Sequence, residues 1–345
     1  MCSWLDRDAF SQCSYGAAIQ KAPLGFIDVG ARGGVHPLVE PLSCATQVLA
    51  FEADAEECER LQHHLAGETK WAGIELAPIA LGQCEADAEL HLLCAATNHS
   101  LLAPDVEFTR RYNMKKWSVI GAAPVKTRSL DSVVFGEYAN NQQYGEFIKL
   151  DTQGTEYEIL LGAERTLRER CVAVVSEVAF FPIYKGQRLF SEVETLLRKQ
   201  GFSFYGFSDL AYRSKRLIDK TKQKSHERMF YADAVFFKDP LPGGECRNTL
   251  NGRQKVVLVL CAMLLNYFDF ALELLDELEE DSHTKEMMKS FIHDVCKCSP
   301  KEQTQQIEAL LKRIKINENN AMIELGVFMD KVYLNSNYNE FSPQP

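Results

Sequence analysis

Short apolar runs rich in β-branched residues alternate with segments of helical periodicity over the first two thirds of the chain. In the segment that starts at Leu189, apolar side chains recur three and four positions apart, at Val193, Leu196 and Leu197, as on one face of a helix. This alternation predicts a mostly parallel sheet with helices on both faces. The expected strands are Phe26–Val29, Val48–Glu52, Glu75–Ala80, Phe147–Leu150, Val172–Val178, Phe202–Phe207 and Ala232–Phe237, and the expected helices are Ala55–Leu65, Glu156–Arg168 and Leu189–Lys199.

The pattern changes after Phe237, where a turn-rich segment is followed by helical periodicity alone. We therefore expect an α/β domain that is followed by an all-helical appendage. The expected helices of the appendage are Gly252–Glu280, His283–Lys297, Pro300–Ile316 and Asn319–Leu334. The expected division is a helical lead-in over residues 1–24, the α/β domain over 25–239, a helical domain over 252–335 and a flexible tail over 336–345.

The composition disfavours one class of partner. The 345 residues include 38 Lys and Arg against 48 Asp and Glu, which gives a formal net charge of −10. An acidic protein repels phosphate backbones on average, so we expect no nucleic-acid partner. The densely basic stretches are Arg213–Arg216 and Lys220–Lys224, and a solvated loop is our preferred interpretation over a phosphate or nucleic-acid site.

Cysteine use and hydropathy favour a cytoplasmic location. The eleven cysteines are scattered, without the spacing of a disulfide framework, which indicates free thiols in a reducing compartment. The first residues have neither a basic nor an apolar targeting pattern. The longest apolar run, Val256–Leu265, is too short to span a bilayer, so we expect a buried helix there and no membrane span.

A glycine-rich turn and an acidic residue point to a nucleoside cofactor. The first strand runs into Asp28-Val29-Gly30-Ala31-Arg32-Gly33-Gly34, and the second ends at Glu52, about twenty residues later. Such a turn lets the backbone approach a ligand closely. An acidic side chain about twenty residues further along the chain, at the end of the next strand, can accept hydrogen bonds from ribose hydroxyls. The turn lacks the G-x-G-x-x-G spacing of dinucleotide-binding proteins, which makes a nicotinamide-dependent oxidoreductase a weak alternative.

The fourth strand continues into the most distinctive motif, Lys149-Leu150-Asp151-Thr152-Gln153-Gly154-Thr155-Glu156. Together with Asp28-Val29-Gly30-Ala31, with Glu52 and with Ser129-Leu130-Asp131-Ser132, it makes the region from Gly25 to Lys238 resemble the FkbM family of S-adenosylmethionine-dependent methyltransferases. The resemblance implies a class I, Rossmann-like methyltransferase fold, with a seven-stranded sheet whose last strand is antiparallel. It also implies transfer of a methyl group to a hydroxyl oxygen of a sugar or another small-molecule or glycan acceptor.

The resemblance also assigns roles to particular residues. It places Asp28, Gly30, Ala31 and Gly34 at the methionine and ribose end of S-adenosylmethionine, Glu52 on the ribose, and Ala80 against the adenine. It places Asp151 and Glu156 beside the transferable methyl group. The chain departs from the family at Arg32, where the family usually has Asn, and at Gln153, where an acidic residue is frequent.

Our own candidates for catalysis are residues that can remove a proton from the acceptor. Asp151 is the first candidate for the base, because burial raises the pKa of a carboxyl group toward neutrality, and Glu177 is the second. His99 lies in an insertion of more than sixty residues before the fourth strand, and it is either a base, a substrate contact or an ordinary loop histidine. Asp151 could instead cap a helix, and Glu177 could instead end its strand in a salt bridge.

The sequence is compatible with two functions from different classes. One is the O-methyltransferase. The other, motivated by Arg32 and Gln153, is a methyltransferase-like binding or interaction module that acts through the C-terminal helices, either as a homo-oligomer or with a protein partner. The acceptor and any metal dependence are left open by the sequence, and no metal ligand set is predicted.

Overall fold

The computed structural model describes residues 4–65, 67, 69–140, 143–219, 221–223, 225–279, 281–297 and 300–332. The chain divides into two compact units, which are described separately. The large unit consists of Met1–Leu210 and Phe230–Cys296, and the small unit consists of Ala211–Met229 and Lys297–Pro345. The domain boundaries expected from the sequence stay a prediction, and the expected tail lies outside the described residues.

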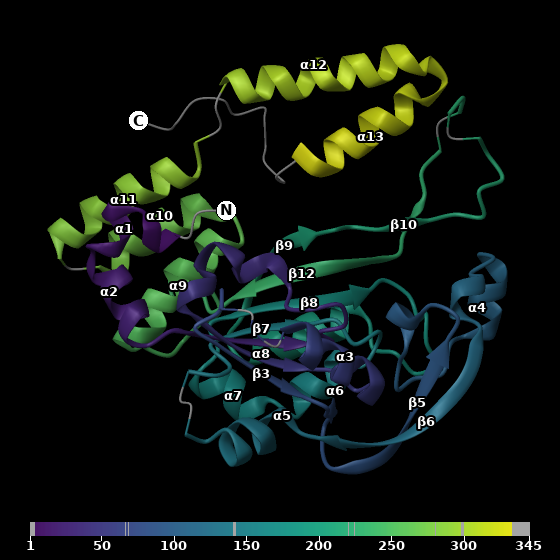
Figure 1. Cartoon of the computed structure of the whole chain (residues 1–345), viewed down its shortest axis with the longest axis horizontal. Coiled ribbons are helices and arrows are strands. Elements are labelled where there is room, and N and C mark those ends of the chain that lie inside the picture. The colour runs from purple at the N-terminus through teal and green to yellow at the C-terminus, as the bar shows by residue number, and fades with distance from the viewer. Residues whose placement is uncertain are drawn as a thin grey trace. The chain divides into compact units, whose positions relative to one another are not determined.

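A seven-stranded sheet forms the centre of the large unit (Figure 1). All seven expected strands are present, and they pair in parallel except for β12, which is antiparallel to both of its neighbours. This agrees with the expected seven-stranded fold. In spatial order the strands are β3 (Gly73–Ala77), β2 (Thr46–Phe51), β1 (Leu24–Val29), β7 (Phe147–Leu150), β8 (Ala173–Ala179), β12 (Tyr231–Phe237) and β9 (Ser203–Ser208).

The long insertion forms a smaller sheet. Its strands, in spatial order, are β4 (Ala80–Leu81), β6 (Val119–Arg128) and β5 (Ala86–Leu93), and the short helix α4 (Val106–Arg111) lies between β5 and β6 in the chain. The expected strand Glu75–Ala80 is therefore wrong at its end. The central strand β3 stops at Ala77, and Ala80 pairs with Thr127 of β6 instead.

One face of the central sheet is covered by helices that follow β6, β7 and β8. The expected helix Ala55–Leu65 is confirmed as α3, and Leu189–Lys199 is confirmed as α8, one residue shorter. The expected helix Glu156–Arg168 is wrong, because the chain breaks at Gly162 and Ala163. The Asp131 carboxylate accepts hydrogen bonds from the Arg165 and Thr166 amides and so starts a second helix there. The helices on this face are α5 (Leu130–Ser132), α6 (Glu156–Leu161), α7 (Glu164–Glu169) and α8 (Phe190–Lys199).

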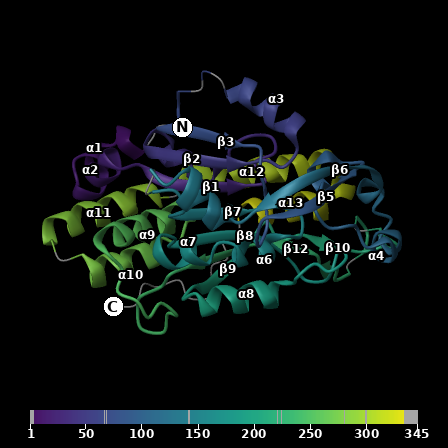
Figure 2. The ribbon, with the colours of Figure 1, turned by 90° about the horizontal axis from the view of Figure 1, so that it is seen from below.

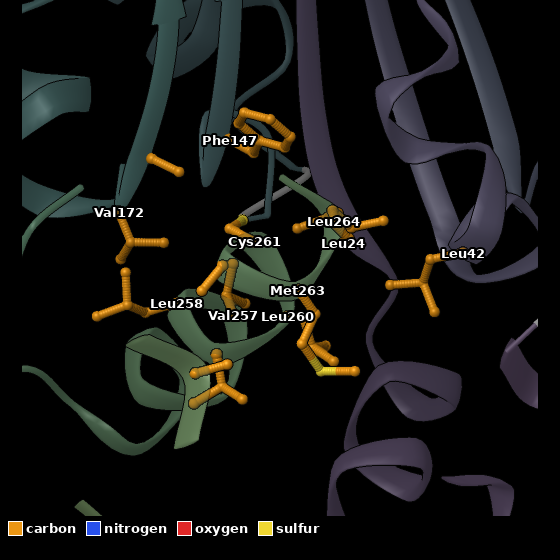
Figure 3. Close-up of a cluster of buried hydrophobic side chains, with 14 of the residues drawn as sticks. Leu24, Leu42, Phe147, Val172, Val257, Leu258, Leu260, Cys261, Met263 and Leu264 are labelled. Carbon is orange, nitrogen blue, oxygen red and sulfur yellow. The ribbon is translucent and has the colours of Figure 1, made fainter. Parts of the chain in front are cut away.

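The other face is covered by the N-terminal helices and by the first three helices after β12 (Figures 1 and 2). Eight consecutive residues, Val257–Leu264, are buried, as expected for a helix that is apolar all round. Figure 3 shows one apolar cluster in which Leu24, Leu42, Phe147 and Val172 lie with residues of this helix, namely Val257, Leu258, Leu260, Cys261, Met263 and Leu264. These helices are α1 (Asp8–Ser11), α2 (Ser14–Lys21), α9 (Gly252–Leu264), α10 (Phe268–Leu278) and α11 (Ser282–Val295).

The expected single helix Gly252–Glu280 is wrong, because the chain turns between α9 and α10. Asn266 has a φ of 64°, in the left-handed region that commonly terminates a helix. The turn lets α10 fold back on α9, so that Phe270, Leu274 and Leu275 are also buried.

An ion pair between the partly buried Arg253 and the buried Glu146 attaches α9 to the amino-terminal edge of the sheet. Arg253 donates through Nε to Oε1 of Glu146 at 2.7 Å and through Nη2 to Oε2 at 2.8 Å. The same guanidinium donates to the carbonyl oxygens of Ala22 and Pro23, and Glu146 also accepts from the Gly25 amide at 3.0 Å. The charge of Glu146 is thereby fully matched where α9, the chain before β1 and the chain before β7 meet.

The small unit contains a hairpin of β10 (Tyr212–Arg213) and β11 (Arg228–Met229) and the helices α12 (Pro300–Ile316) and α13 (Ala321–Val332). The expected helix Pro300–Ile316 is confirmed, and Asn319–Leu334 is confirmed between Ala321 and Val332, while Leu334 lies outside the described residues. Arg313 of α12 contacts Glu324 of α13, with Nε 2.9 Å from Oε2. Across the described ranges, no helix has both the length and the apolar character that a membrane crossing requires.

Candidate functional site

A pocket lies at the edge of the central sheet where β1, β2 and β7 end, and we call this edge the site edge. Five of the residues expected from the sequence line it, namely Gly30, Glu52, Ala80, His99 and Asp151. The other five expected residues, Asp28, Ala31, Gly34, Glu156 and Glu177, are not among its lining residues. The remaining lining residues are Val29, Arg32, Phe51, Ala53, Ile79, Leu81, Leu90, Ala96, Thr97, Ser100, Leu101, Thr152, Gln153 and Thr155.

The glycine turn after β1 brings two strand ends close together. Gly30 has a φ of 86°, and a Cβ at this position would lie 2.0 Å from the Asp151 carbonyl oxygen, so any larger residue would push β1 and β7 apart. The Gly30 and Ala31 amides both donate to the Phe51 carbonyl at 3.0 Å. Ala31 therefore contributes through its backbone, which ties the turn to the end of β2.

Asp28 is buried directly behind this turn, with 1% of its surface exposed. Its Oδ2 accepts a hydrogen bond from the His36 amide at 2.8 Å, whereas its Oδ1 is buried and has no partner among the described residues. Burial raises the pKa of Asp28 to about 6, against the lowering effect of Lys149 and of the His36 amide. An unpartnered buried acceptor is costly, so a cationic or hydrogen-bond-donating ligand group that reaches Oδ1 would be favoured.

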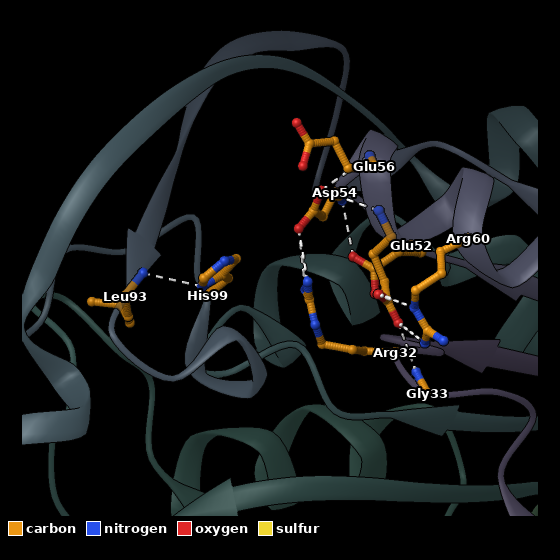
Figure 4. A network of polar contacts seen from close by, with 9 residues as sticks. Arg32, Gly33, Glu52, Asp54, Glu56, Arg60, Leu93 and His99 are labelled. Carbon is orange, nitrogen blue, oxygen red and sulfur yellow. Dashed lines mark hydrogen bonds and ion pairs between the residues drawn. The ribbon is translucent and has the colours of Figure 1, made fainter.

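The acidic end of β2 is held by its own loop (Figure 4). Oε1 of Glu52 accepts from the Asp54 amide at 2.9 Å, and burial raises the pKa of Glu52. Arg32, one of the two departures from the family pattern, pairs with Asp54, with 2.7 Å between Nη2 and Oδ2. Asp54 thus balances the cation that Arg32 adds to the pocket wall.

The second departure, Gln153, joins the two carboxylates predicted as bases. Its Nε2 donates to Oδ1 of Asp151 at 3.0 Å and to Oε2 of Glu177 at 3.1 Å. Its Oε1 accepts from the Tyr184 hydroxyl at 3.0 Å, and its carbonyl accepts from the Ser100 hydroxyl at 2.7 Å. Gln153 has a φ of 60°, so its backbone is held in a region that non-glycine residues seldom adopt.

Glu177 does not reach the pocket but supports it from behind through Gln153. Burial raises the pKa of Glu177 well above its ordinary value, and repulsion by Asp151, Glu156 and Asp233 raises it further. The sequence pattern identified Gln153 only as a departure from the family. Gln153 can link the two acids only because the loop after β7 lies beside β8 in the folded chain.

Sequence reasoning missed a fourth acid, Asp233, on β12. In the sheet register Asp28 is opposite Lys149, and Asp233 is opposite Glu177. Asp151 follows Lys149 by two positions. All five side chains therefore point to one face of the sheet. We call Asp28, Asp151, Glu177 and Asp233 the acidic row. The detectable signal was one charged residue inside the otherwise apolar run 231–237.

Lys149 is the cation that faces the acidic row. Its Nζ lies 3.3 Å from Oδ2 of Asp151, and the carboxylates of Asp151, Asp28 and Asp233 raise its pKa despite the opposing effect of burial. Burial raises the pKa of Asp233 to about 6, and Asp151 adds to the shift while Lys149 opposes it. In the part of the chain that the structure describes, no three His, Cys, Asp or Glu side chains are grouped to hold a metal ion.

Two predicted residues have well-defined structural contacts. Oε1 of Glu156 accepts from the Thr152 amide at 2.8 Å and from the Gly154 amide at 3.1 Å, so this side chain holds the loop before α6.

Nδ1 of His99 accepts from the Leu93 amide at 3.1 Å (Figure 4), and burial and Arg32 lower the pKa of His99. A neutral imidazole that accepts at Nδ1 carries its proton on Nε2, which makes Nε2 a donor.

The order and directions of the strands are those of an α/β methyltransferase fold. Residues 28–204, slightly more than half of the chain, match the profile of the methyltransferase FkbM domain. The protein belongs to this family, as its motifs predicted. The comparison with curated proteins finds no match.

Several solved methyltransferases are distantly similar to the chain. A methyltransferase FkbM from Methylobacillus flagellatus KT is 14% identical, with a TM-score of 0.35, and the match covers 62% of this chain and 43% of that one. A magnesium protoporphyrin IX methyltransferase from Synechocystis PCC 6803, with bound SAM, is 13% identical, with a TM-score of 0.31 and coverage of 67% and 80%. At these scores the similarities add nothing to the family match.

Proposed function

We propose that the protein is an S-adenosylmethionine-dependent O-methyltransferase that acts on a hydroxyl of a sugar or another small-molecule or glycan acceptor. The observation that carries this proposal is the pocket at the site edge, because it brings Gly30, Glu52, Ala80 and Asp151 to one place from four separate segments. The family membership supports methyl transfer, and the chemistry of the acidic row supports a hydroxyl acceptor.

The residues present fit the cofactor. Oδ1 of Asp28 is a buried acceptor without a partner, which suits the ammonium of a methionine moiety. Glu52 at the end of β2 suits ribose hydroxyls, Gly30 leaves room for close backbone approach, and Ala80 offers a small apolar contact to a base. When bound, S-adenosylmethionine supplies an activated methyl group on a sulfonium leaving group.

A hydroxyl acceptor has to lose a proton as its oxygen gains the methyl group. Asp151 is the base in this proposal, because it lines the pocket and its carboxylate is stabilised by Lys149 and by the Gln153 amide. The Asp151 carboxylate accepts the proton of the acceptor hydroxyl, and the oxygen would take the methyl group that bound S-adenosylmethionine supplies, with the thioether product as leaving group. Burial and the neighbouring acids raise the pKa of Glu177 well above its ordinary value, which favours its neutral form and so lessens the negative charge of the row.

His99 has a different role in this proposal from that of a base. Its Nδ1 is already an acceptor for the Leu93 amide, so Nε2–H is the group that can donate to an acceptor oxygen. It therefore positions the acceptor hydroxyl, and proton removal falls to Asp151.

The first test is calorimetric titration with S-adenosylmethionine and with its demethylated product. We expect micromolar binding by the unchanged protein and a loss of at least about tenfold in Asp28→Ala and in Glu52→Ala. Glu89→Ala, an exposed acid on β5, is the matched control and should bind as the unchanged protein does. No binding by the unchanged protein would overturn the proposal.

A second candidate function is a binding module that retains the methyltransferase architecture. The observation that favours it is Gln153, whose amide already occupies an oxygen of each of the two acids. Cofactor binding without methyl transfer to a broad panel of sugars and other alcohols would support this second candidate. Transfer that disappears in Asp151→Asn would support the O-methyltransferase.

A further inference from the structure

Charge is divided unequally between the two units. The small unit contains 13 Lys and Arg against 8 Asp and Glu, whereas the large unit contains 25 against 40. The excess comes from the segment Ala211–Met229, which has seven Lys and Arg against two acids. A basic unit inside an acidic protein is attracted to a negatively charged partner that the rest of the chain repels.

Exposed apolar side chains are concentrated in the same unit. Of the fifteen large hydrophobic residues exposed in the described ranges, eleven belong to the small unit. Leu217 is 87% exposed and Ile316 is 77% exposed. A concentration of this kind marks a surface that binds something apolar. The eleven residues are Tyr212, Leu217, Ile218, Ile307, Leu311, Ile316, Met322, Ile323, Leu325, Val327 and Met329.

In the hairpin the two features coincide. Tyr212 pairs with Met229 and Arg213 pairs with Arg228 at the base of the hairpin, and the Ser214 hydroxyl donates to Glu227. Beyond this base the exposed sequence Lys215-Arg216-Leu217-Ile218 projects before Asp219 turns the chain by accepting from the Thr221 amide at 3.0 Å. Two exposed cations are therefore directly followed in the chain by two exposed apolar side chains.

We propose that the small unit binds the surface of a membrane that contains anionic lipid, with Leu217 and Ile218 entering the boundary between head groups and acyl chains. A membrane surface is the partner that takes up exposed aliphatic side chains and adjacent cations together. Nucleic acid would use the cations and leave Leu217 and Ile218 in water. This inference stands on charge and exposure in the small unit alone, so it does not depend on the methyltransferase proposal.

The test is sedimentation of the full chain with vesicles of phosphatidylcholine alone or with 30% phosphatidylserine. We expect binding to the anionic vesicles that weakens as salt rises, because screening shortens the reach of the basic residues. Lys215→Glu with Arg216→Glu should lower the partition coefficient at least about tenfold, since each cation contributes strongly at an anionic surface. Leu217→Ser with Ile218→Ser should lower it about tenfold at constant charge.

Matched controls come from the large unit. Lys126→Glu with Lys185→Glu makes the same charge change at exposed positions, and Val106→Ser with Leu161→Ser makes a similar apolar change. Both should bind vesicles as the unchanged protein does, and thermal melting should show all four variants folded. The proposal is overturned by equal binding to both vesicle types, by controls that lose as much as the hairpin variants, or by binding to an RNA oligonucleotide in place of vesicles. A dimer in light scattering that is lost in Leu217→Ser with Ile218→Ser would also overturn it, in favour of a second copy of the chain.

Discussion

The two ends of the central sheet both bury charge, but they do so in opposite ways. At the amino-terminal end Glu146 has a bidentate partner in Arg253 and a further hydrogen bond from the Gly25 amide. At the site edge the four acids of the acidic row face the cation Lys149 and the neutral amide of Gln153. At the amino-terminal end, which we call the balanced end, the paired charges stabilise the fold. At the site edge, which we call the unbalanced end, the excess of acids leaves groups that can interact with a ligand or a proton.

The same strands build both ends. On β1 the positions on one face read Leu24, Phe26 and Asp28, and on β7 they read Phe147 and Lys149, with Asp151 next. The apolar positions are covered by α9, and the charged ones lie toward the site edge. One face of the sheet thus forms a core where α9 covers it and carries charged side chains where α9 does not.

The largest expected effect is at the unbalanced end. Asp151→Asn keeps the shape of the side chain but removes the base, so kcat for a hydroxyl acceptor should fall about 10²- to 10⁴-fold. Steady-state kinetics with radiolabelled cofactor measure this, and Asp87→Asn on β5 is the exposed control. An unchanged kcat would mean that proton removal is not a task of Asp151.

The next effect is at the balanced end. Arg253→Ala leaves Glu146 buried without a cation, which should lower the free energy of unfolding by about 3–5 kcal/mol. Urea denaturation measures the loss. Arg188→Ala breaks an exposed pair with Glu192, and solvent screening makes its expected loss much smaller than that of Arg253→Ala. Equal losses in the two variants would contradict the contrast between buried and exposed pairing.

The pH dependence of the free energy of unfolding tests whether the buried Asp28 at the site edge titrates. The pKa of Asp28 is raised to about 6 in the folded protein, so between pH 4 and pH 6 the folded state holds more protons than the unfolded state, and stability falls as pH rises. Asp28→Asn removes this loss. Relative to the unchanged protein, it should gain about 1–3 kcal/mol between pH 4.5 and pH 7.5, because two pKa units correspond to roughly 3 kcal/mol.

Chemical denaturation at the two pH values measures this difference. Glu89→Gln, at an exposed position, should show no such change. A gain of the same size at both pH values would show that Asp28 does not titrate in this window.

The smallest effect concerns the link between the two acids. Gln153→Met removes the amide that donates to Asp151 and Glu177, while it keeps similar volume. We expect kcat to fall about tenfold. The acidic limb of the pH–rate profile should also shift, because Gln153 acts through the acids that it holds in place. A change in KM alone, with an unmoved pH profile, would argue against this role.

Much of the fold could be predicted from local pattern. Strands such as Phe147–Leu150 have apolar runs between turn residues, and α3 and α12 have clear periodicity, so these elements carry their own signals. The two helix predictions that failed, at Gly162 and at Asn266, concern breaks within a helical pattern. Those breaks depend on partners that are distant in sequence or on a backbone conformation that the pattern does not record.

The site divides in the same way. The sequence alone indicates which segments form the site edge, because Asp28, Gly30, Glu52 and Asp151 lie within or just after the ends of parallel strands, and these ends meet at one edge of the sheet. Which side chains meet there depends on the tertiary structure. The contacts of Gln153 with Glu177, the register of Asp233 opposite Glu177 and the pairing of Glu146 with Arg253 join residues 24 to 107 positions apart. Such contacts are set by the packing of whole elements, and local patterns in the sequence carry no record of them.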